Sequence, residues 1–420
     1  MLSFRQQESF LLSADAILRS LVELIVKHRL ARRAISIFLL PFELILTVPL
    51  YLVRIRALRI SVLGRIGHLA TEPDIYLKVR MLGLRRWKFG IIICPPGAAA
   101  NECLLEYWGR HIRVVRYPFW SRILARLYRH PHLSYDVSRY YMGMNETAPF
   151  IAVKRAWSTR PALLTLTEKH RRDGRAKLVE MGVPADADLI CFHCREGSYS
   201  PSDEEWHSFR NSSIENYLPA VIELTKRGFW CIRMGDPTMR RIPPTERVID
   251  YPHLDARSDW MDIFLCGSCK FFLGSASGLV QVAGVFGTPS GAANQAPFSH
   301  ALQFGLKDVA IPKLMWSETQ ERYLTFREIF GSDVANFRFT ALFEKQRIRP
   351  VENTPEEVRD LALEMLERSA GRAAYTQEDE ELQQRFKALM RPGHYSYGGI
   401  SRIGRDFLRK YAHLLGDRQG

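Results

Sequence analysis

The chain has 420 residues, of which 46% are hydrophobic and 25% charged, and its formal net charge is +14. This length is enough for two ordinary domains, and the composition is that of a globular protein, which excludes a disordered or fibrous chain. The charge is uneven: residues 1–185 hold 30 of the 59 Lys and Arg but only 13 of the 45 Asp and Glu. We therefore expect the N-terminal half to face something anionic, such as membrane lipid or an anionic acceptor. Because no RNA-reading motif accompanies this charge, we predict no nucleic-acid partner.

Residues 1–57 are predicted to form a hydrophobic and basic helical segment that associates with an anionic membrane surface. Ser3–Arg33 has apolar residues at helical spacing, and residues 34–53 read AISIFLLPFELILTVPLYLV. This run is nearly long enough to span a bilayer, but Glu43 and two prolines interrupt it and arginines flank both ends. Three interpretations stay open: a helix pair in the membrane interface, which the basic flanks favour, a true span, and a buried hairpin. Since we find no secretory signal and an odd number of cysteines, the expected location is cytoplasmic, peripheral at the inner face of the cytoplasmic membrane.

Residues 58–184 show a β–α–β–α–β order and are predicted to form an N-terminal Rossmann-like acceptor domain. The expected strands are Arg59–Leu63, Phe89–Cys94 and Ile112–Val115, with a helix at Asn101–Arg110. Alternation of this kind gives a parallel sheet with right-handed crossovers. A basic helix, Leu163–Met181, leads to a Gly-Val-Pro break, which we take as the domain boundary.

Residues 185–375 repeat this order and are predicted to form a C-terminal Rossmann-like donor domain. The expected strands are Leu189–His193, Phe229–Met234, Val248–Tyr251 and Phe271–Leu273, and the expected helices are Ser213–Arg227, Asp259–Cys269 and Leu279–Phe286. A further helix should begin at Thr354, with Pro355 in its first position and two glutamates behind it. Residues 376–420 are predicted to be helices that pack back on the N-terminal domain.

Candidate ligand-binding residues follow the strands of the second domain, because open α/β sheets bind ligands beyond the carboxyl ends of their strands. They are His193, Arg195, Arg210 and Asn211 after the first strand, Arg233, Gly235 and Asp236 after the second, Gly274, Ser275, Ser277 and Gly278 after the third, and Asn294 after the fourth. Two arginines, a histidine, a helix N-terminus and a pair of hydroxyls on one rim would fit a diphosphate. The alternative is an ordinary strand-to-helix turn with arginines in surface ion pairs.

Two Cys-x-x-Cys pairs, at Cys191 and Cys266, suggest zinc. However, a strand points Cys191 and Cys194 to opposite faces, and the two pairs lie farther apart than in known zinc modules. We therefore predict no metal and no other cofactor.

Several stretches between about Arg65 and Leu415 resemble a family of bacterial glycosyltransferases found with surface-polysaccharide genes. These stretches are RIGHL, CFHCREGSY, RNSSIENYLPA, IRMGDP, VIDYP and DIFLCGSCKFFLGSASGL. The GSASG-to-GTP stretch is also similar to the nucleotide-binding segment of heptosyltransferases. His193–Arg195 resembles the diphosphate-contacting HxR motif of some fucosyltransferases, but Glu196 and Gly197 depart from its continuation, so a GDP-sugar is not implied.

The resemblance implies an α/β fold of the GT-B type, in which two Rossmann-like domains face each other across a cleft. It implies metal-independent transfer of a sugar from a nucleotide-sugar donor to a glycan or lipid-linked glycan acceptor, with inversion at the sugar. Arg195, Arg233 and the turn Gly274–Gly278 would then stabilise the leaving diphosphate.

An inverting transfer also needs a general base that deprotonates the acceptor hydroxyl. His68 is the first candidate because it lies in the first βα loop of the N-terminal domain; Asp203, Glu204 and Asp236 are alternatives. Two other functions stay open. A nucleotide-sugar isomerase or epimerase would use the same cleft without a separate acceptor, and a non-catalytic membrane-associated scaffold would need none of the strand-end arginines.

Overall fold

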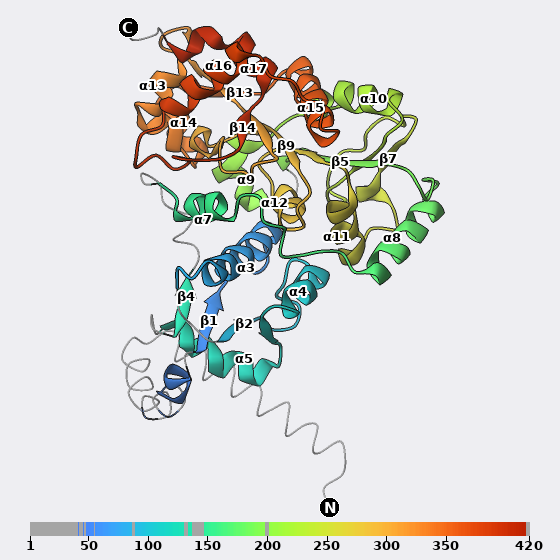
Figure 1. The fold of residues 1–420 in the computed structure, drawn as a ribbon, viewed down its shortest axis with the longest axis vertical. Helices are drawn as coiled ribbons and strands as arrows, with labels where there is room; N and C mark the ends of the chain where they lie inside the picture. The colour runs from blue at the N-terminus through green and yellow to red at the C-terminus, as the bar shows by residue number, and fades with distance from the viewer. Residues whose placement is uncertain are drawn as a thin grey trace, which may run out of the picture.

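The computed structural model describes residues 41, 45, 48–53, 55–85, 89–129, 133–136, 147–197 and 201–416. These residues form two α/β lobes, the N-terminal one below and the C-terminal one above in Figure 1. Most of the predicted hydrophobic segment 1–57 lies outside the described residues. Within the described part of the chain, no helix combines the length and apolarity that crossing a bilayer requires.

The N-terminal lobe is built on a four-stranded parallel sheet with the order β3-β2-β1-β4. Its elements are β1 (Ile55–Arg59), α3 (Ile66–Met81), β2 (Phe89–Ile93), α4 (Glu102–Gly109), β3 (Arg113–Val115), α5 (Pro118–Leu124), η1 (Ala125–Arg129), β4 (Ser134–Asp136) and α7 (Pro149–Trp157). The second and third predicted strands are confirmed. The prediction of a first strand at Arg59–Leu63 is wrong: the buried pair Ala57 and Leu58 carries the pairing with β2, and residues 60–65 form the turn into α3.

The C-terminal lobe contains a seven-stranded parallel sheet with the order β14-β10-β9-β8-β5-β6-β7. Its elements are α8 (Glu168–Glu180), β5 (Leu189–His193), α9 (Pro201–His207), η3 (Ser208–Arg210), η4 (Ile214–Asn216), α10 (Leu218–Lys226), β6 (Trp230–Arg233), β7 (Val248–Asp250), η5 (Tyr251–His253), α11 (Asp259–Ser268), β8 (Phe272–Gly274), α12 (Gly278–Val285), β9 (Ser290–Gln295), η6 (Phe298–His300), β10 (Val309–Pro312) and β14 (Arg402–Ile403). Numbered along the chain, the strands from β7 to β10 follow the order 3-2-1-4-5-6 of doubly wound nucleotide-binding sheets. The predicted α/β class with parallel sheets is confirmed.

A small antiparallel sheet, β12-β11-β13, and several helices complete the C-terminal lobe. These elements are β11 (Leu314–Ser317), β12 (Arg322–Tyr323), α13 (Phe326–Phe330), η7 (Asp333–Asn336), α14 (Thr340–Lys345), β13 (Ile348–Val351), α15 (Pro355–Ser369), α16 (Gln377–Ala388), α17 (Arg405–Lys410) and η8 (Ala412–Leu415). The predicted start of α15 is confirmed, because Thr354 and Glu357 form a capping box with Pro355 in the first turn.

The helices after residue 376 pack on the C-terminal lobe, which corrects the prediction that they return to the N-terminal domain. Only the segment between α16 and β14 does so within the described residues: the backbone N–H of Ala148 donates to the carbonyl oxygen of Tyr395 at 2.9 Å, and the backbone N–H of Gly393 donates to Thr147 Oγ1 at 2.9 Å.

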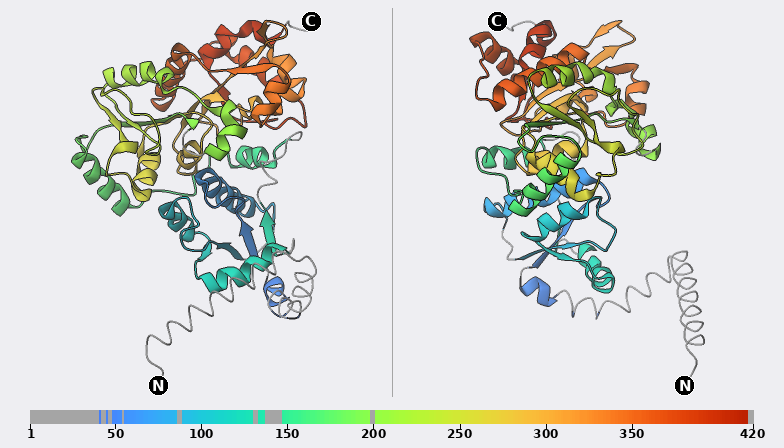
Figure 2. Two further views of the ribbon diagram at one scale, coloured as in Figure 1. Left: turned by 180° about the vertical axis from the view of Figure 1, so that it is seen from behind. Right: turned by 90° about the vertical axis from the view of Figure 1, so that its right-hand side faces the viewer.

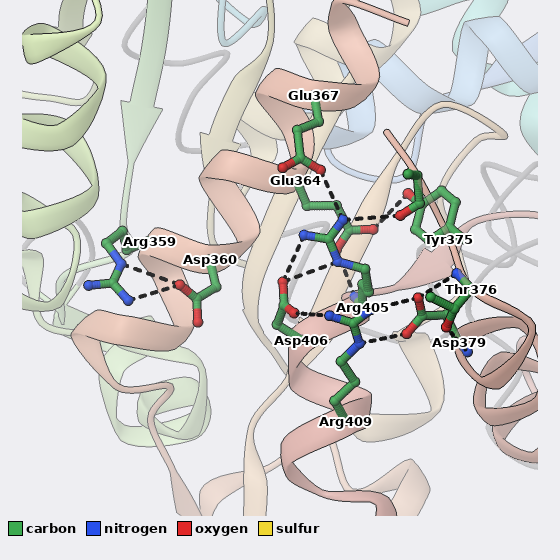
Figure 3. Close-up of polar contacts among 11 residues, drawn as sticks. Arg359, Asp360, Glu364, Glu367, Tyr375, Thr376, Asp379, Arg405, Asp406 and Arg409 are labelled. Atoms are coloured by element: carbon green, nitrogen blue, oxygen red, sulfur yellow. Dashed lines mark hydrogen bonds and ion pairs between the residues drawn. The ribbon is translucent and has the colours of Figure 1, made fainter. Parts of the chain in front are cut away.

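A network of ion pairs holds α15, α16 and α17 together (Figure 3). Arg405 Nη1 lies 2.9 Å from Glu367 of α15, and Arg409 Nε lies 2.6 Å from Asp379 of α16. β14, between α16 and α17, adds the outermost strand to the large sheet. Figure 1 places these helices at the end of the molecule away from the N-terminal lobe.

The chain enters the C-terminal lobe before the predicted boundary at residue 184. Helix α8, which we assigned to the N-terminal domain, packs on α11 of the second lobe. A side chain at Gly174 would overlap the ring of Phe264, so the absence of a Cβ at this position lets the two helices approach. The basic residues of α8 are mostly exposed lysines and arginines. Their charge therefore did not indicate which lobe the helix packs on.

The two lobes share a hydrophobic core. One continuous cluster of buried residues runs from Leu58, Leu69 and Trp108 in the first lobe to Ile232 and Val280 in the second. Helix α3 packs along α12, and α4 packs against α11. Both contacts lie at the seam between the lobes (Figures 1 and 2). The carboxyl ends of β1 and β2 lead into α3 and α4, so the first sheet presents this edge to the C-terminal lobe.

Candidate functional site

The carboxyl ends of β5 and β8 form the switch point of the large sheet. From β5 the chain runs to β6 and β7 on one side, and then crosses to β8, β9 and β10 on the other. Ligands of such sheets bind in the crevice at this point. The structure therefore brings together the predicted residues after β5 and the predicted turn after β8.

Two hydrogen bonds tie the end of β5 to the turn between β8 and α12. Ser275 Oγ accepts from the backbone N–H of Arg195 at 2.8 Å, and the backbone N–H of Ser275 donates to the carbonyl oxygen of His193 at 3.2 Å. The backbone N–H of Ser277 donates to the carbonyl oxygen of Ser275 at 2.7 Å. These bonds hold the turn in a fixed position against Arg195.

The start of α12 lacks the usual side-chain cap. Ser277 is the N-cap residue, but its hydroxyl makes no cap hydrogen bond, and Ser277 Oγ is buried without any hydrogen-bond partner. A buried unpaired polar group costs about 1–3 kcal/mol. The N–H groups of the first helical turn and the positive end of the helix dipole lie at the same place. This combination suits a phosphate oxygen, which would accept from both the hydroxyl and the backbone.

Arg195 and Arg210 lie at this turn, as predicted. Arg210 Nη2 donates to the carbonyl oxygen of Ala276 within the turn. Arg195 Nη1 donates to Asn211 Oδ1 and lies 3.7 Å from Glu204 Oε2. Arg195 therefore contacts both a neutral amide oxygen and a partly exposed carboxylate, and Arg210 contacts a backbone oxygen of the turn.

Sequence reasoning missed a third cation, Lys313. It directly follows β10, is 3% exposed, and donates from Nζ to the carbonyl oxygen of Asn211. Burial lowers its pKa to about 8, which leaves the ammonium largely protonated at neutral pH. The signal was available, because Lys313 stands after the apolar run Val309–Pro312 as the other candidates stand after their strands.

His193 is buried and neutral. Its Nδ1 lies 3.0 Å from the carbonyl oxygen of Met234, so this nitrogen must carry the proton that it donates. Burial lowers the pKa of the imidazole to about 4. His193 therefore contributes no positive charge to an anion site at neutral pH, and its Nε2 is a hydrogen-bond acceptor.

Arg233 does not act as the predicted diphosphate clamp. Its side chain is 1% exposed and lies between two carboxylates, with Nη2 3.1 Å from Glu196 Oε1 and Nη1 3.0 Å from Asp250 Oδ1. It also donates to the carbonyl oxygen of Arg240. Because two negative charges already compensate it, this guanidinium holds β6, β7 and the loop after β5 together.

Three further predicted residues have structural roles. Asn294 is buried and exchanges hydrogen bonds with Asn353, which ties β9 to the start of α15. Asp236 accepts hydrogen bonds from Thr238 and closes a local turn. Gly235 has φ 151°, and a Cβ there would overlap the Met239 sulfur. These contacts give each of the three residues a role within the fold, and their assignment to the donor site stays a prediction.

Asp203, the alternative base, lies on α9, and its side chain is outside the described residues. Its neighbour Glu204 accepts from Asn211 Nδ2 at 2.5 Å and faces Arg195, so it orients the cationic side of the site.

The first turn of α3 carries a His–Glu pair. His68 Nδ1 lies 2.8 Å from Glu72 Oε1, one helical turn away, and Glu72 is fully buried. The other Glu72 oxygen accepts from the backbone N–H of Ser61 at 2.8 Å. A buried carboxylate in this position fixes the orientation of the imidazole. Sequence reasoning selected His68 but missed Glu72, although the i,i+4 spacing on a predicted helix would have indicated it.

The first turns of α3 and α12 touch. The backbones of Gly67 and Gly278 lie so close that a Cβ on Gly278 would stand 2.8 Å from the Gly67 nitrogen. Farther along the same two helices, Thr71 Oγ1 lies 3.5 Å from Gln281 Oε1. His68 directly follows Gly67 in the chain, so its backbone lies next to this contact. The contact brings the N-termini of α3 and α12 together between the lobes, and each N-terminus carries the positive end of its helix dipole.

Two cavities lie elsewhere. One, of about 330 Å³, lies on the seam between α4, α8 and α11 and is lined by both lobes, with Tyr107, His170 and Trp260 among its residues. The other, of about 450 Å³, lies at the amino ends of β8, β9 and β10, with Lys270, Lys307 and Arg368 in its lining. Neither adjoins the β8–α12 turn. Within the described residues, no three His, Cys, Asp or Glu side chains gather as a metal site.

No protein-family model matches the chain, and no curated protein matches it. Among solved structures, it is similar to a glycosyl transferase of family 9 from Veillonella parvula DSM 2008, with 12% identity, a TM-score of 0.33, and coverage of 73% of this chain and 80% of that one. It is also similar to TibC from enterotoxigenic E. coli H10407, an iron-containing dodecameric glycosyltransferase solved alone and with ADP-D-beta-D-heptose. The TibC matches have 14% identity and a TM-score of 0.29, and cover 57% of each chain. Similarity this low assigns no family, so the functional argument depends on the residues of this chain.

Proposed function

We propose that this chain is a glycosyltransferase that moves a sugar from a nucleotide-sugar donor to a glycan acceptor, with inversion at the sugar carbon. The observation that carries the proposal is the contact between the starts of α3 and α12. It puts a histidine with a buried carboxylate on one lobe beside an uncapped helix start, with its arginines, on the other. A base and an anion site in such proximity are the two parts that this reaction needs.

The donor would bind through its diphosphate at the β8–α12 turn. Ser277 Oγ and the first N–H groups of α12 would donate to phosphate oxygens, and Arg195, Arg210 and Lys313 would supply positive charge around them. As the bond between the sugar carbon and the phosphate oxygen breaks, the electron pair leaves with the nucleoside diphosphate. Positive groups already fixed at this position stabilise that charge without reorganising.

The acceptor hydroxyl would approach from the N-terminal lobe. Because Glu72 occupies Nδ1 of His68, the acceptor proton would be taken up at Nε2 while the hydroxyl oxygen forms the new bond to the sugar carbon. Glu72 would then face an imidazolium and stabilise it. Protonated His68 later returns its proton to solvent, which completes the cycle.

The test begins with donor binding, measured as the shift in melting temperature with UDP-, GDP-, ADP- and CMP-sugars, since a ligand that binds the folded state raises that temperature. With the donor so identified, His68→Gln should lower kcat about 10²–10⁴-fold while the donor Kd stays unchanged. His111→Gln, at an exposed histidine of the same lobe, is the matched control and should keep wild-type activity.

Each outcome separates the alternatives. If none of the four donors raises the melting temperature, the donor site is refuted. If a donor binds and is converted without any acceptor, the chain is an isomerase or epimerase. If a donor binds but His68→Gln transfers sugar as fast as wild type, His68 is not the base, and transfer must use another group.

A further inference from the structure

The amino edge of the first sheet forms the end of the molecule farthest from the C-terminal lobe (Figures 1 and 2). β1 and β2 both start at this edge, where Ile55 pairs with Phe89. The helical residues 48–52 precede β1, and the end of α3 precedes β2. Segments that are distant in the sequence are therefore brought to one edge by the β–α–β topology.

This edge exposes large apolar side chains. Leu52 is 73% exposed, Met81 60%, Leu84 57% and Phe89 55%. Met81 ends α3, Leu84 lies in the turn that follows, Phe89 begins β2, and Leu52 is a helical residue shortly before β1. Contiguous apolar surface on a soluble protein marks an interaction site. We call these four residues, together with Arg80 and Arg85, the amino-edge surface.

The charge on this edge is positive. Arg80 and Arg85 are exposed, whereas the acids of α3 point inward: Glu72 is fully buried and Asp74 is 6% exposed. Lys78 is paired with Asp74 at 2.7 Å, so it does not add to the surface charge. Arginines interspersed with leucine, methionine and phenylalanine, without an exposed acid in these segments, are complementary to an anionic lipid surface.

The helical residues 48–52 are anchored to the lobe. Leu50 packs on a small core cluster made of Ala57, Ile93, Leu127 and Leu133. Its neighbours Tyr51 and Leu52 are consequently held outward on a fixed support. Helix α5, which adds Leu124 to the same cluster and exposes Trp120, lies at the same end of the molecule in Figure 1. Exposed tryptophan and tyrosine are typical of the membrane–water interface.

We propose that the amino-edge surface docks on an anionic lipid bilayer, with Leu52, Leu84 and Phe89 inserted among the headgroups. β1 has five residues, so one strand length, about 17 Å, separates this surface from the opposite edge of the sheet. The contact between α3 and α12 then faces away from the lipid. This inference does not depend on the proposed transferase activity, because it uses none of the residues at the seam.

The test is co-flotation of the full chain with vesicles of phosphatidylcholine alone or mixed with phosphatidylserine. Met81→Glu with Leu84→Glu should weaken partitioning at least about tenfold, because apolar burial is replaced by charge repulsion. Arg80→Gln and Arg85→Gln should each lower binding to the mixed vesicles about fivefold, and leave binding to phosphatidylcholine unchanged. Leu254→Glu, at an exposed apolar position of the other lobe, is the control and should bind as wild type.

A second measurement is independent of any loss of binding. A polarity-sensitive dye on Leu84→Cys should shift to the blue with mixed vesicles, while the same dye on Leu306→Cys should not. The proposal is overturned if the Met81 and Leu84 double variant floats as well as wild type, or if the dye at position 84 stays in water. It is also overturned if the chain self-associates and these variants make it monomeric, since the surface would then be a protein interface.

Discussion

The ends of β5 and β6 look alike in sequence but differ in the structure. Each has an arginine at or just beyond the strand and an acidic residue shortly afterwards. Arg233, at the end of β6, is enclosed by Glu196 and Asp250. Arg195, two residues past β5, lies 3.7 Å from the partly exposed Glu204 and donates to the oxygens of His207 and Asn211, and its backbone supports the turn before α12. The two arginines thus differ in burial and in the distance to their carboxylates, and Arg195 is the one that adjoins the candidate site.

The sharpest test of this difference is Arg233→Met. The substitution keeps an unbranched side chain but leaves Glu196 and Asp250 without their shared cation. Removing one partner from a buried ion pair costs about 3–5 kcal/mol, so the free energy of unfolding should fall by that amount in urea titrations. Arg247→Met, whose guanidinium is largely exposed and 3.8 Å from Glu246, should change it by less than about 1 kcal/mol. Equal losses for the two variants would contradict the comparison.

His193 lies at the end of β5 and bonds to Met234, next to the end of β6. Its burial should make the free energy of unfolding fall as the pH is lowered. Burial lowers its pKa to about 4 from an ordinary value of 6.5, so the folded state resists protonation while the unfolded chain accepts it. This contribution of His193 to the free energy of unfolding is fully present above about pH 6.5. It is lost as the pH falls to about 4, and the total loss is roughly 3 kcal/mol.

The control is His193→Asn, which keeps a donor for the Met234 carbonyl but cannot titrate. Its free energy of unfolding should fall less than that of wild type over this pH range. The neighbouring acids Glu196, Asp236 and Asp250 are present in both proteins, so the difference between the two curves isolates His193. Identical pH curves would show that His193 is not held neutral.

Local patterns in the sequence predicted the elements well and the pairing of charges poorly. Short apolar runs predicted the strands at Leu189–His193 and Phe89–Cys94. Thr354 and Pro355, which are adjacent in the chain, predicted the capped start of α15. The neutralisation of Arg233 depends on Asp250, seventeen residues away, and on strand order. The packing of α8 on α11 depends on Gly174 meeting Phe264. No local pattern encodes such contacts, because they arise only when the sheet is assembled.

Among the candidate site residues, sequence reasoning found those whose role depends on position along the chain. Ser275, Ser277 and Arg195 follow their strands directly, and parallel strands end at one edge. Sequence reasoning missed Lys313 and Glu72 because each needed one more step: a fifth strand end for the lysine, and the helical spacing from His68 for the glutamate. Asn294 was selected by the same rule, but its left-handed backbone and its bonds to Asn353 give it a structural role.

Arg233→Met should mainly lower stability, whereas Arg195→Ala should mainly lower the affinity for the donor. Because its carboxylate partner Glu204 is 3.7 Å away and 35% exposed, the loss of Arg195 should lower stability by less than half of the Arg233→Met effect. Donor affinity should fall about 10–100-fold, which corresponds to one charge-assisted hydrogen bond of about 1.5–3 kcal/mol. Calorimetry with the donor identified by thermal shift measures both quantities. A large stability loss with unchanged donor affinity would make Arg195 a second structural arginine.

The smallest effect, from Ser277→Ala, separates binding from stability most cleanly. Ser277 Oγ is buried without a partner, so removing it should leave the free protein as stable or up to about 1 kcal/mol more stable. If the hydroxyl instead serves a bound phosphate, the same variant should bind the donor several-fold more weakly. Most substitutions that weaken binding through damage to the fold also lower stability, and this one is expected to move the two in opposite directions. Ser332→Ala, which removes a hydroxyl that donates to the carbonyl oxygen of Ile329, is the control and should cost stability without affecting the donor. A variant at position 277 that is less stable and binds normally would mean that the hydroxyl supports the turn, and that the start of α12 does not hold the ligand through it.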